Sequence, residues 1–306
     1  MMQRPDNLYT LKEALSVAER GKYAIGSFSP RYTPMIRPVL AASQQNNSPA
    51  IVQISQKELE RYHIEPAEFG EVFFRELRDL QITVPITLHL DHTKDIRVIE
   101  AAIAAGFTSV MIDASEHDLA ENIRITREVA RFAHEQGVSV EAELGKIGTT
   151  DFVETDTDEE MYTDPNEAEQ FVRETKVDAL AVSVGTAHGV YQVRQPKVDY
   201  ERLQAIRART DVHLVLHGGS GVPAEMVKAA IQLPGGGVSK VNIATDLEVA
   251  LLAALGRADR MTNAECKNLA EDQLVAGRNA VAEVVAEKMN VFLGSAGKAG
   301  TFGAAK

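Results

Sequence analysis

Residues 86–92 read Ile-Thr-Leu-His-Leu-Asp-His, a short apolar run that ends in charged side chains. Eight such β-rich runs occur along the chain, separated by longer helical patterns at a spacing of roughly 25 to 35 residues. They cover residues 24–29, 50–55, 86–91, 109–113, 139–144, 179–184, 213–217 and 240–243. Strands that alternate with helices form right-handed βαβ units and a parallel sheet. Eight units predict a (β/α)8 barrel, the TIM-barrel fold.

Helical periodicity between the runs supports this prediction. Apolar residues recur at intervals of three and four over residues 96–105, 119–135 and 200–209, and a further helix over 10–20 precedes the first strand. An open, doubly wound sheet is the alternative, but no G-x-G-x-x-G follows the first run. No Ser/Gly-rich linker divides the 306 residues. We therefore expect one barrel domain over residues 1–306, with 263–306 as a helical and partly mobile C-terminal extension.

The composition argues against several partners. The formal net charge is −12, so the chain repels nucleic acid and anionic membrane surfaces. Cys266 is the single cysteine, which rules out an intrachain disulfide and permits a reducing compartment. The first residues lack the apolar run of a signal peptide, and no later run has transmembrane length. These features predict a cytoplasmic protein without a nucleic-acid or membrane partner.

Polar side chains follow six of the predicted strands at the point where each strand leads into its helix. They belong to the segments 89–92, 113–115, 141–145, 185–189, 217–221 and 242–246. In a (β/α)8 barrel these points meet at one mouth, where catalytic groups gather. The sequence therefore predicts an active site assembled from strand ends.

Three histidines lie at three different strand ends, namely His92, His188 and His217. Three neutral imidazoles with one open position are the arrangement of a catalytic zinc ion. Three unrelated structural histidines are the alternative. His89 precedes Asp91 by two residues on the same strand, so it faces the same side and is a partner of the site or a packing residue.

Asp91 and His92 would point to opposite sides of an extended strand unless its end is kinked. With such a kink, Asp91 projects toward a substrate and shuttles a proton at neutral pH, provided that its pKa is raised. The alternative is an aspartate that only orients a ligand histidine.

Glycines and hydroxyls suggest a phosphate site. The loop Gly218-Gly219-Ser220-Gly221 opens a helix, and residues 242–246 form a second helix start at the neighbouring strand end. Bare backbone N–H groups at helix N-termini bind phosphate, and such sites recur after strands seven and eight of this fold. A tight turn needed only for packing is the alternative.

Five segments in order carry a family resemblance: His-x-Asp-His, Glu-Ala-Glu-Leu-Gly, Gly-Thr-Ala-His-Gly, His-Gly-Gly-Ser-Gly and Asn-Ile-Ala-Thr-Asp. Together they resemble the class II ketose-bisphosphate aldolases of the fructose- and tagatose-bisphosphate type, from Tyr9 to about Gly297. The resemblance implies a zinc site at His92, His188 and His217, with Asp113 and Glu143 as carboxylates near the metal, and Asp91 as the proton donor. It also implies that Gly189, Gly218, Ser220, Asn242, Thr245 and Asp246 hold the phosphate of dihydroxyacetone phosphate, with a monovalent cation (Na⁺ or K⁺) assisting.

The resemblance predicts a carbon–carbon lyase that works through a zinc-stabilised enediolate. A Schiff base would need a lysine at the mouth, whereas Lys240 is expected at the N-terminal end of strand eight and Lys146 lacks a reason to be deprotonated. Two departures concern other steps. Asp151 stands where the family places a glutamate on a loop, and Arg278 is the candidate for a second phosphate although a favoured position holds Val275. The first departure leaves the identity of the enediolate base open, and the second leaves open whether the acceptor aldehyde carries a phosphate.

Two other functions stay open. A metal-dependent sugar-phosphate isomerase or epimerase would use the same enediolate, and a non-catalytic aldolase-like subunit would keep the fold while supporting a partner enzyme. A metallohydrolase is disfavoured, because the first strand lacks a His-x-His pair. The resemblance also predicts a homodimer or homotetramer, and the apolar residues of the C-terminal helices either form that interface or cover the barrel.

Overall fold

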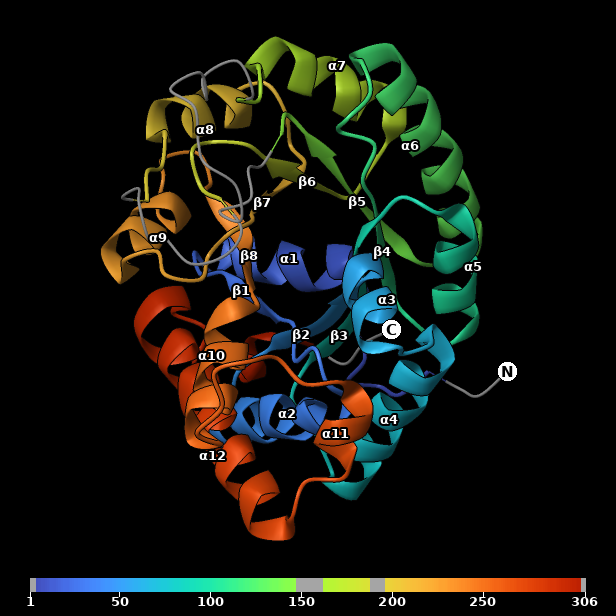
Figure 1. The fold of residues 1–306 in the computed structure, drawn as a ribbon. Coiled ribbons are helices and arrows are strands. Elements are labelled where there is room, and N and C mark those ends of the chain that lie inside the picture. Colours follow the sequence, from blue (N-terminus) through green and yellow to red (C-terminus); the bar gives the residue numbers. More distant parts are fainter. Residues whose placement is uncertain (1–3, 147–161, 188–195, 304–306) are drawn as a thin grey trace.

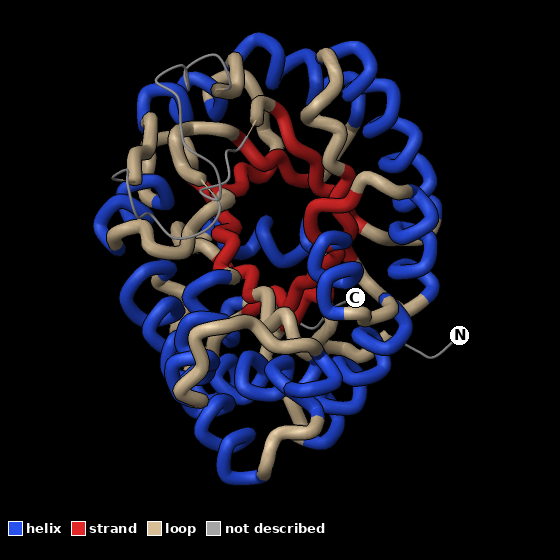
Figure 2. The backbone as a smooth tube through the Cα atoms, viewed as in Figure 1, coloured by secondary structure: helices blue, strands red, loops and turns tan. Residues whose placement is uncertain are grey.

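The structure is a computed structural model that describes residues 4–146, 162–187 and 196–303. Eight parallel strands, each paired with its neighbours in sequence, close into a barrel with β1 beside β8 (Figures 1 and 2). The strands are β1 Ile25–Phe28, β2 Ala50–Ser55, β3 Ile86–Thr93, β4 Ser109–Ile112, β5 Ser139–Leu144, β6 Ala179–Val182, β7 His213–Leu216 and β8 Val238–Ile243. The predicted (β/α)8 barrel is confirmed, with each strand inside or close to its predicted range.

Helices surround this barrel as a continuous outer layer (Figure 2). They are α1 Leu11–Arg20, α2 Ile36–Gln45, α3 Gln56–Tyr62, α4 Pro66–Asp79, α5 Ile96–Ala104, α6 Leu119–Glu135, α7 Pro165–Thr175, α8 Tyr200–Arg207, α9 Ala224–Ile231, α10 Thr245–Ala254, α11 Asn263–Lys267 and α12 Glu271–Glu287. Local signals explain several starts. The side chains of Asp118, Asp164 and Asp199 accept backbone N–H bonds at the starts of α6, α7 and α8.

The leading helix α1 closes the N-terminal end of the barrel, and in Figure 1 it lies across the ring of strands. A capping box between Thr10 and Glu13 fixes its start. Its buried Leu11 and Leu15 belong to the same apolar cluster as Ile25 and Val215, which lie on two of the strands. The half of the barrel interior near the N-terminal ends of the strands is therefore filled by apolar side chains.

The half of the interior near the carboxyl ends of the strands is polar, because the residues that point inward there are charged or polar. On β3, Leu88 and Leu90 belong to the apolar layer beneath the helices, whereas His89 and Asp91 alternate with them and turn inward. On β5, Val140 and Ala142 likewise belong to that outer apolar layer. Charged groups are thus concentrated near the carboxyl ends of the strands, where the mouth lies.

The C-terminal region differs from one continuous helix. The pattern over residues 263–290 is broken after Lys267, so that α11 and α12 are separate, and a π-helical segment Lys288–Leu293 follows α12. Val281, Val285 and Met289 are buried in the chain itself, in the apolar layer that includes α2 and α10. These residues cover the barrel. Nowhere in the described chain is a helix long and apolar enough to span a membrane.

Candidate active site

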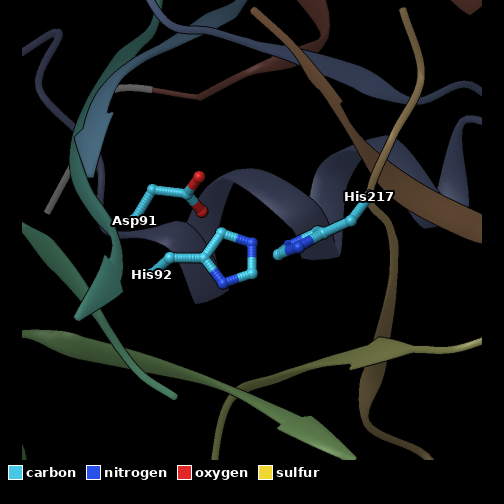
Figure 3. A group of neighbouring side chains, drawn as sticks. All are labelled: Asp91, His92 and His217. Carbon is cyan, nitrogen blue, oxygen red and sulfur yellow. The ribbon is translucent and has the colours of Figure 1, made fainter. Parts of the chain in front are cut away.

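A kink at the end of β3 places two functional side chains on one side. The backbone of His92 has φ of 20°, and the pairing of β3 with β4 shifts register between Leu90 and Thr93. Asp91 and His92 therefore both face His217, which follows the last residue of β7 (Figure 3). The ligand atoms of these three residues lie within 4.8 Å of one another, and the two imidazole centroids are 4.5 Å apart.

His217 is held from below by a carboxylate. Its Nε2 lies 2.8 Å from Oε1 of Glu141, and both side chains are completely buried. Its Nδ1 faces the other way, 3.7 Å from Oε2 of Glu143. Burial lowers the pKa of His217, and the neighbouring His92 lowers it further, so a neutral ring is favoured. A neutral imidazole is the form that binds a metal.

His92 is surrounded by carboxylates. Its Nδ1 lies 3.0 Å from Oδ2 of Asp113 and 3.8 Å from Oε2 of Glu143. Burial alone would lower the pKa of His92, but Asp91, Asp113 and Glu143 outweigh it and raise the pKa to about 10. The Asp113 carboxylate also accepts from the Ser115 hydroxyl at 2.7 Å. The pocket thus stabilises positive charge before any metal is bound.

Asp91 accepts hydrogen bonds from two amides. The Nε2 of Gln53 donates to its Oδ2 at 3.1 Å, and the Nδ2 of Asn242 donates to its Oδ1 at 3.1 Å. Burial alone would raise the pKa of Asp91, but His92, His89, Lys240 and His217 hold it well below its usual value. The condition of a raised pKa is therefore not met in the absence of metal, because positive charge and hydrogen bonds around Asp91 outweigh desolvation.

Lys240 does not lie at the bottom of strand eight. Strand β8 begins at Val238, and the buried Nζ of Lys240 reaches 3.8 Å from Oδ1 of Asp91 and 2.8 Å from Oε2 of Glu141. The expectation that it lies away from the mouth is wrong, because its long side chain extends up the barrel axis. Its Nζ is held by the buried carboxylate of Glu141, which disfavours its use as a Schiff-base nucleophile. The side chain of Lys146, in contrast, is exposed.

The donor set at the mouth fits a zinc ion. Imidazole nitrogens and carboxylate oxygens are zinc ligands, and His92, Asp113 and Glu143 form a second convergent group that shares His92 with the first. Each histidine also has a carboxylate partner on one nitrogen, Asp113 for His92 and Glu141 for His217. Such carboxylate–histidine pairs fix the tautomer of metal ligands. His188, Gly189 and Asp151 lie outside the described residues.

The phosphate-binding candidates surround two neighbouring strand ends. Gly218 has φ of 67°, and a Cβ there would lie 2.3 Å from the backbone oxygen of Ala187, so a side chain is excluded. The buried Ser220 hydroxyl accepts from the backbone N–H groups of Ala244 and Asp246, both at 3.3 Å. Two loops are thereby joined at the start of α10.

Other candidates have partners that the sequence did not indicate. The Thr245 hydroxyl accepts from Arg31 at 3.3 Å, and the Asp246 carboxylate pairs with Lys288 at 2.6 Å. Asn242, expected at the phosphate, has its amide on Asp91. Arg278 lies on α12, where its Nε donates to the backbone oxygen of Pro34 at 3.3 Å.

The contacts just described do not link Arg278 to a strand end. Burial lowers the pKa of Arg278. The titratable groups that also influence this pKa are Arg37, Glu76, Glu271 and Cys266, and none of these four lies at a strand end. Sequence reasoning also missed the involvement of Gln53, Glu141 and Lys240. Each occupies an inward position by strand alternation, which was the available signal.

Comparison with known proteins identifies the family of the chain. The family model "Fructose-bisphosphate aldolase class-II" matches residues 9–298. A fructose-bisphosphate aldolase of Geobacillus stearothermophilus is 40% identical over 297 residues, covering 96% of this chain and 99% of that protein. A 6-phospho-5-dehydro-2-deoxy-D-gluconate aldolase of Bacillus subtilis (strain 168) is 39% identical over 295 residues, covering 95% and 97%.

A solved structure agrees with these relatives. The crystal structure of the YdjI aldolase from Escherichia coli K12 superimposes with a TM-score of 0.80 at 32% identity, covering 95% of this chain and 99% of that one. Both the sequence matches and the structural match extend over nearly the whole chain. The chain therefore belongs to the class II fructose-bisphosphate aldolase family, and it is a carbon–carbon lyase that acts on a phosphorylated sugar.

Proposed function

We propose that this protein reversibly cleaves a phosphorylated ketose to dihydroxyacetone phosphate and an aldehyde, with one catalytic zinc ion held by His92, His188 and His217. The observation that carries the proposal is the convergence of Asp91, His92 and His217, whose ligand atoms lie within 4.8 Å of one another at the carboxyl ends of the strands. The carboxylates of Asp113, which follows β4, and of Glu143, on β5, add negative charge to this site.

Zinc, when bound, supplies Lewis-acid stabilisation of the negative charge that develops on the ketone oxygen. Asp91 then acts at the hydroxyl group that is formed or cleaved, as the carboxyl that gives or takes its proton. Gln53 and Asn242 support this role, because their amides fix the carboxylate in one orientation. Asp151 is proposed as the base that removes the proton next to the ketone.

We further propose that the substrate phosphate binds at the strand-seven and strand-eight ends. Gly189, Gly218, Ser220, Asn242, Thr245 and Asp246 form this cradle. The bare backbone of Gly218 and the start of α10 support the assignment, since backbone N–H groups at a helix N-terminus bind anions. A monovalent cation, Na⁺ or K⁺, is proposed to assist there by balancing the phosphate against the negative net charge.

The acceptor aldehyde is the least constrained part of the proposal. Relatives of nearly equal identity are named for a ketose bisphosphate in one case and for a phosphorylated deoxygluconate in the other. Arg278 is proposed to bind a second phosphate or another anion on the acceptor. We also propose that the enzyme is cytoplasmic and that its chain forms a single domain. From the family resemblance we further propose a homodimer or a homotetramer.

Cleavage assays test the proposal. Fructose and tagatose bisphosphates, their 1-monophosphates and phosphorylated deoxygluconates are offered, and release of dihydroxyacetone phosphate is followed by a coupled dehydrogenase. We expect release that stops with a chelator and returns with zinc. Turnover without release of a three-carbon fragment would indicate an isomerase instead. Bound zinc with no turnover of any substrate would contradict the proposed reaction.

A further inference from the structure

A buried row of hydrogen-bonded side chains lies below the strand ends, and the catalytic and phosphate-binding roles proposed above do not include two of its members, Glu141 and Lys240. Glu141 lies at its centre, on β5. One carboxylate oxygen lies 2.8 Å from Nε2 of His217 and the other lies 2.8 Å from Nζ of Lys240. The side chains of all three residues are completely buried.

The Lys240 ammonium takes a place where a metal could otherwise bind. His89, Asp91 and Glu141 form a buried group whose ligand atoms converge within 4.8 Å. The Nζ of Lys240 lies 2.8 Å from Glu141, 3.5 Å from Nε2 of His89 and 3.8 Å from Asp91. It therefore balances the charge of the two carboxylates in this lower group.

We propose that Glu141 and Lys240 are positioning residues that fix His217 in the tautomer with its proton on Nε2, so that Nδ1, on the side of the metal, carries no proton. The inference rests on the proposed function in one respect, namely that His217 binds zinc. Both residues act on the proposed metal ligand through His217, although Lys240 also lies 3.8 Å from Asp91.

The direction of each hydrogen bond follows from the donor inventory. An ammonium has three donors and no acceptor, so Lys240 can only donate to Glu141. An ionised carboxylate only accepts, so its second oxygen must accept from Nε2–H of His217. The other nitrogen, Nδ1, lies on the side of Glu143 at the mouth. Glu141, whose charge Lys240 balances, thereby places the ring proton of His217 on Nε2.

The same reasoning predicts an unusual response to Glu141→Gln. Lys240 still requires an acceptor, so the glutamine oxygen turns toward it and the amide NH₂ turns toward Nε2 of His217. Nε2 must then accept, which moves the ring proton to Nδ1, the nitrogen that would bind the metal. Adding Lys240→Met removes this requirement, so the amide can reverse and restore the original tautomer.

The experiment measures tautomer and zinc affinity in the full chain. Nitrogen-15 histidine NMR on the metal-free protein reports the His217 tautomer, with a His217→Gln sample for assignment. Zinc affinity is measured by competition with a chromophoric chelator. We expect Glu141→Gln to shift the proton to Nδ1 and to weaken zinc binding about tenfold to hundredfold. Lys240→Met/Glu141→Gln should recover the tautomer and most of the affinity.

A matched control variant and a comparison of two double variants complete the experiment. Glu76→Gln removes a carboxylate from the Arg37 ion pair between α2 and α4 and should leave zinc affinity within twofold. If the single variant fails to fold, the double variant is compared with Lys240→Met/Glu141→Leu, which should bind zinc more weakly because His217 loses its acceptor. Unchanged tautomer and affinity in Glu141→Gln, or equal affinity in the two double variants, would overturn the inference. Absence of zinc binding by the wild type would count against the proposed function, while the tautomer of the metal-free protein still tests the role of Glu141.

Discussion

Zinc binding should release a proton from His92, so affinity should depend steeply on pH. The carboxylates of Asp91, Asp113 and Glu143 raise the pKa of His92 to about 10, although burial opposes them. A metal binds only the neutral ring. At pH 7.5 the ring is about 2.5 pH units below that pKa, and at 1.36 kcal/mol per unit its deprotonation costs about 3.4 kcal/mol. Apparent affinity is then roughly 300-fold weaker than above pH 10.

The expected slope is about tenfold in affinity per pH unit between pH 7 and 9. Competition with a chelator of known pH dependence measures it, and calorimetry in buffers of different ionisation enthalpy counts the protons released. An ordinary histidine, with a pKa of about 6.5, is nearly all neutral at pH 8 and therefore adds little to the pH dependence of zinc affinity. His217 adds none, because its pKa is lowered.

A variant separates His92 from other proton sources. Asp113→Asn removes a carboxylate charge that raises the pKa of His92, so proton release at pH 9 should fall below that of the wild type. Without metal, the contribution of His92 to stability is full below its unfolded pKa of about 6.5 and is lost as pH rises through about 10. A flat affinity between pH 7 and 9, with no proton released, would refute this reasoning.

Three further outcomes are expected. Asp91→Asn should lower kcat by about 10²- to 10⁴-fold while zinc content, measured by metal analysis, stays at the wild-type level; a loss below tenfold would contradict a proton-transfer role. Gly218→Ala should lower the free energy of unfolding by about 1–3 kcal/mol in a urea titration, because its Cβ meets the Ala187 carbonyl, whereas Gly300→Ala, in open space, should change it little. Arg278→Ala should raise KM for a bisphosphate more than for the corresponding 1-monophosphate, and an equal effect on both would remove it from the acceptor site.

Most of the fold was predictable because its signals are local. Each strand is a short β-rich apolar run, and helices such as Leu119–Glu135 begin and end at the residues that the 3.6 period indicates. The break between α11 and α12 was missed. The start of α11 is fixed by a capping box between Thr262 and Glu265, but the residues after Lys267 still continue an acceptable helical pattern.

The sequence allowed a prediction only of those site residues that lie at the ends of strands. Strand order brings the ends carrying His92 and His217 to one mouth, and the condition of a kink at His92 could be stated in advance. The reach of Lys240 and the sign of the pKa shift at Asp91 could not, because both depend on how far side chains from four strands extend into a shared interior. Glu141 was visible as an inward residue, but its partner His217 is set by the barrel's stagger.

Hydrogen exchange of dihydroxyacetone phosphate tests the proposed chemistry most directly, since it needs no acceptor aldehyde. The phosphate ester is incubated with the enzyme in D₂O, and proton NMR follows the carbon next to the ketone that bears the free hydroxyl. We predict that one of its two hydrogens exchanges, that a chelator stops the exchange, and that zinc restores it. Exchange that persists in the chelator-treated, zinc-free protein, or its absence from the zinc-loaded wild type, would contradict a metal-dependent aldolase site at these strand ends.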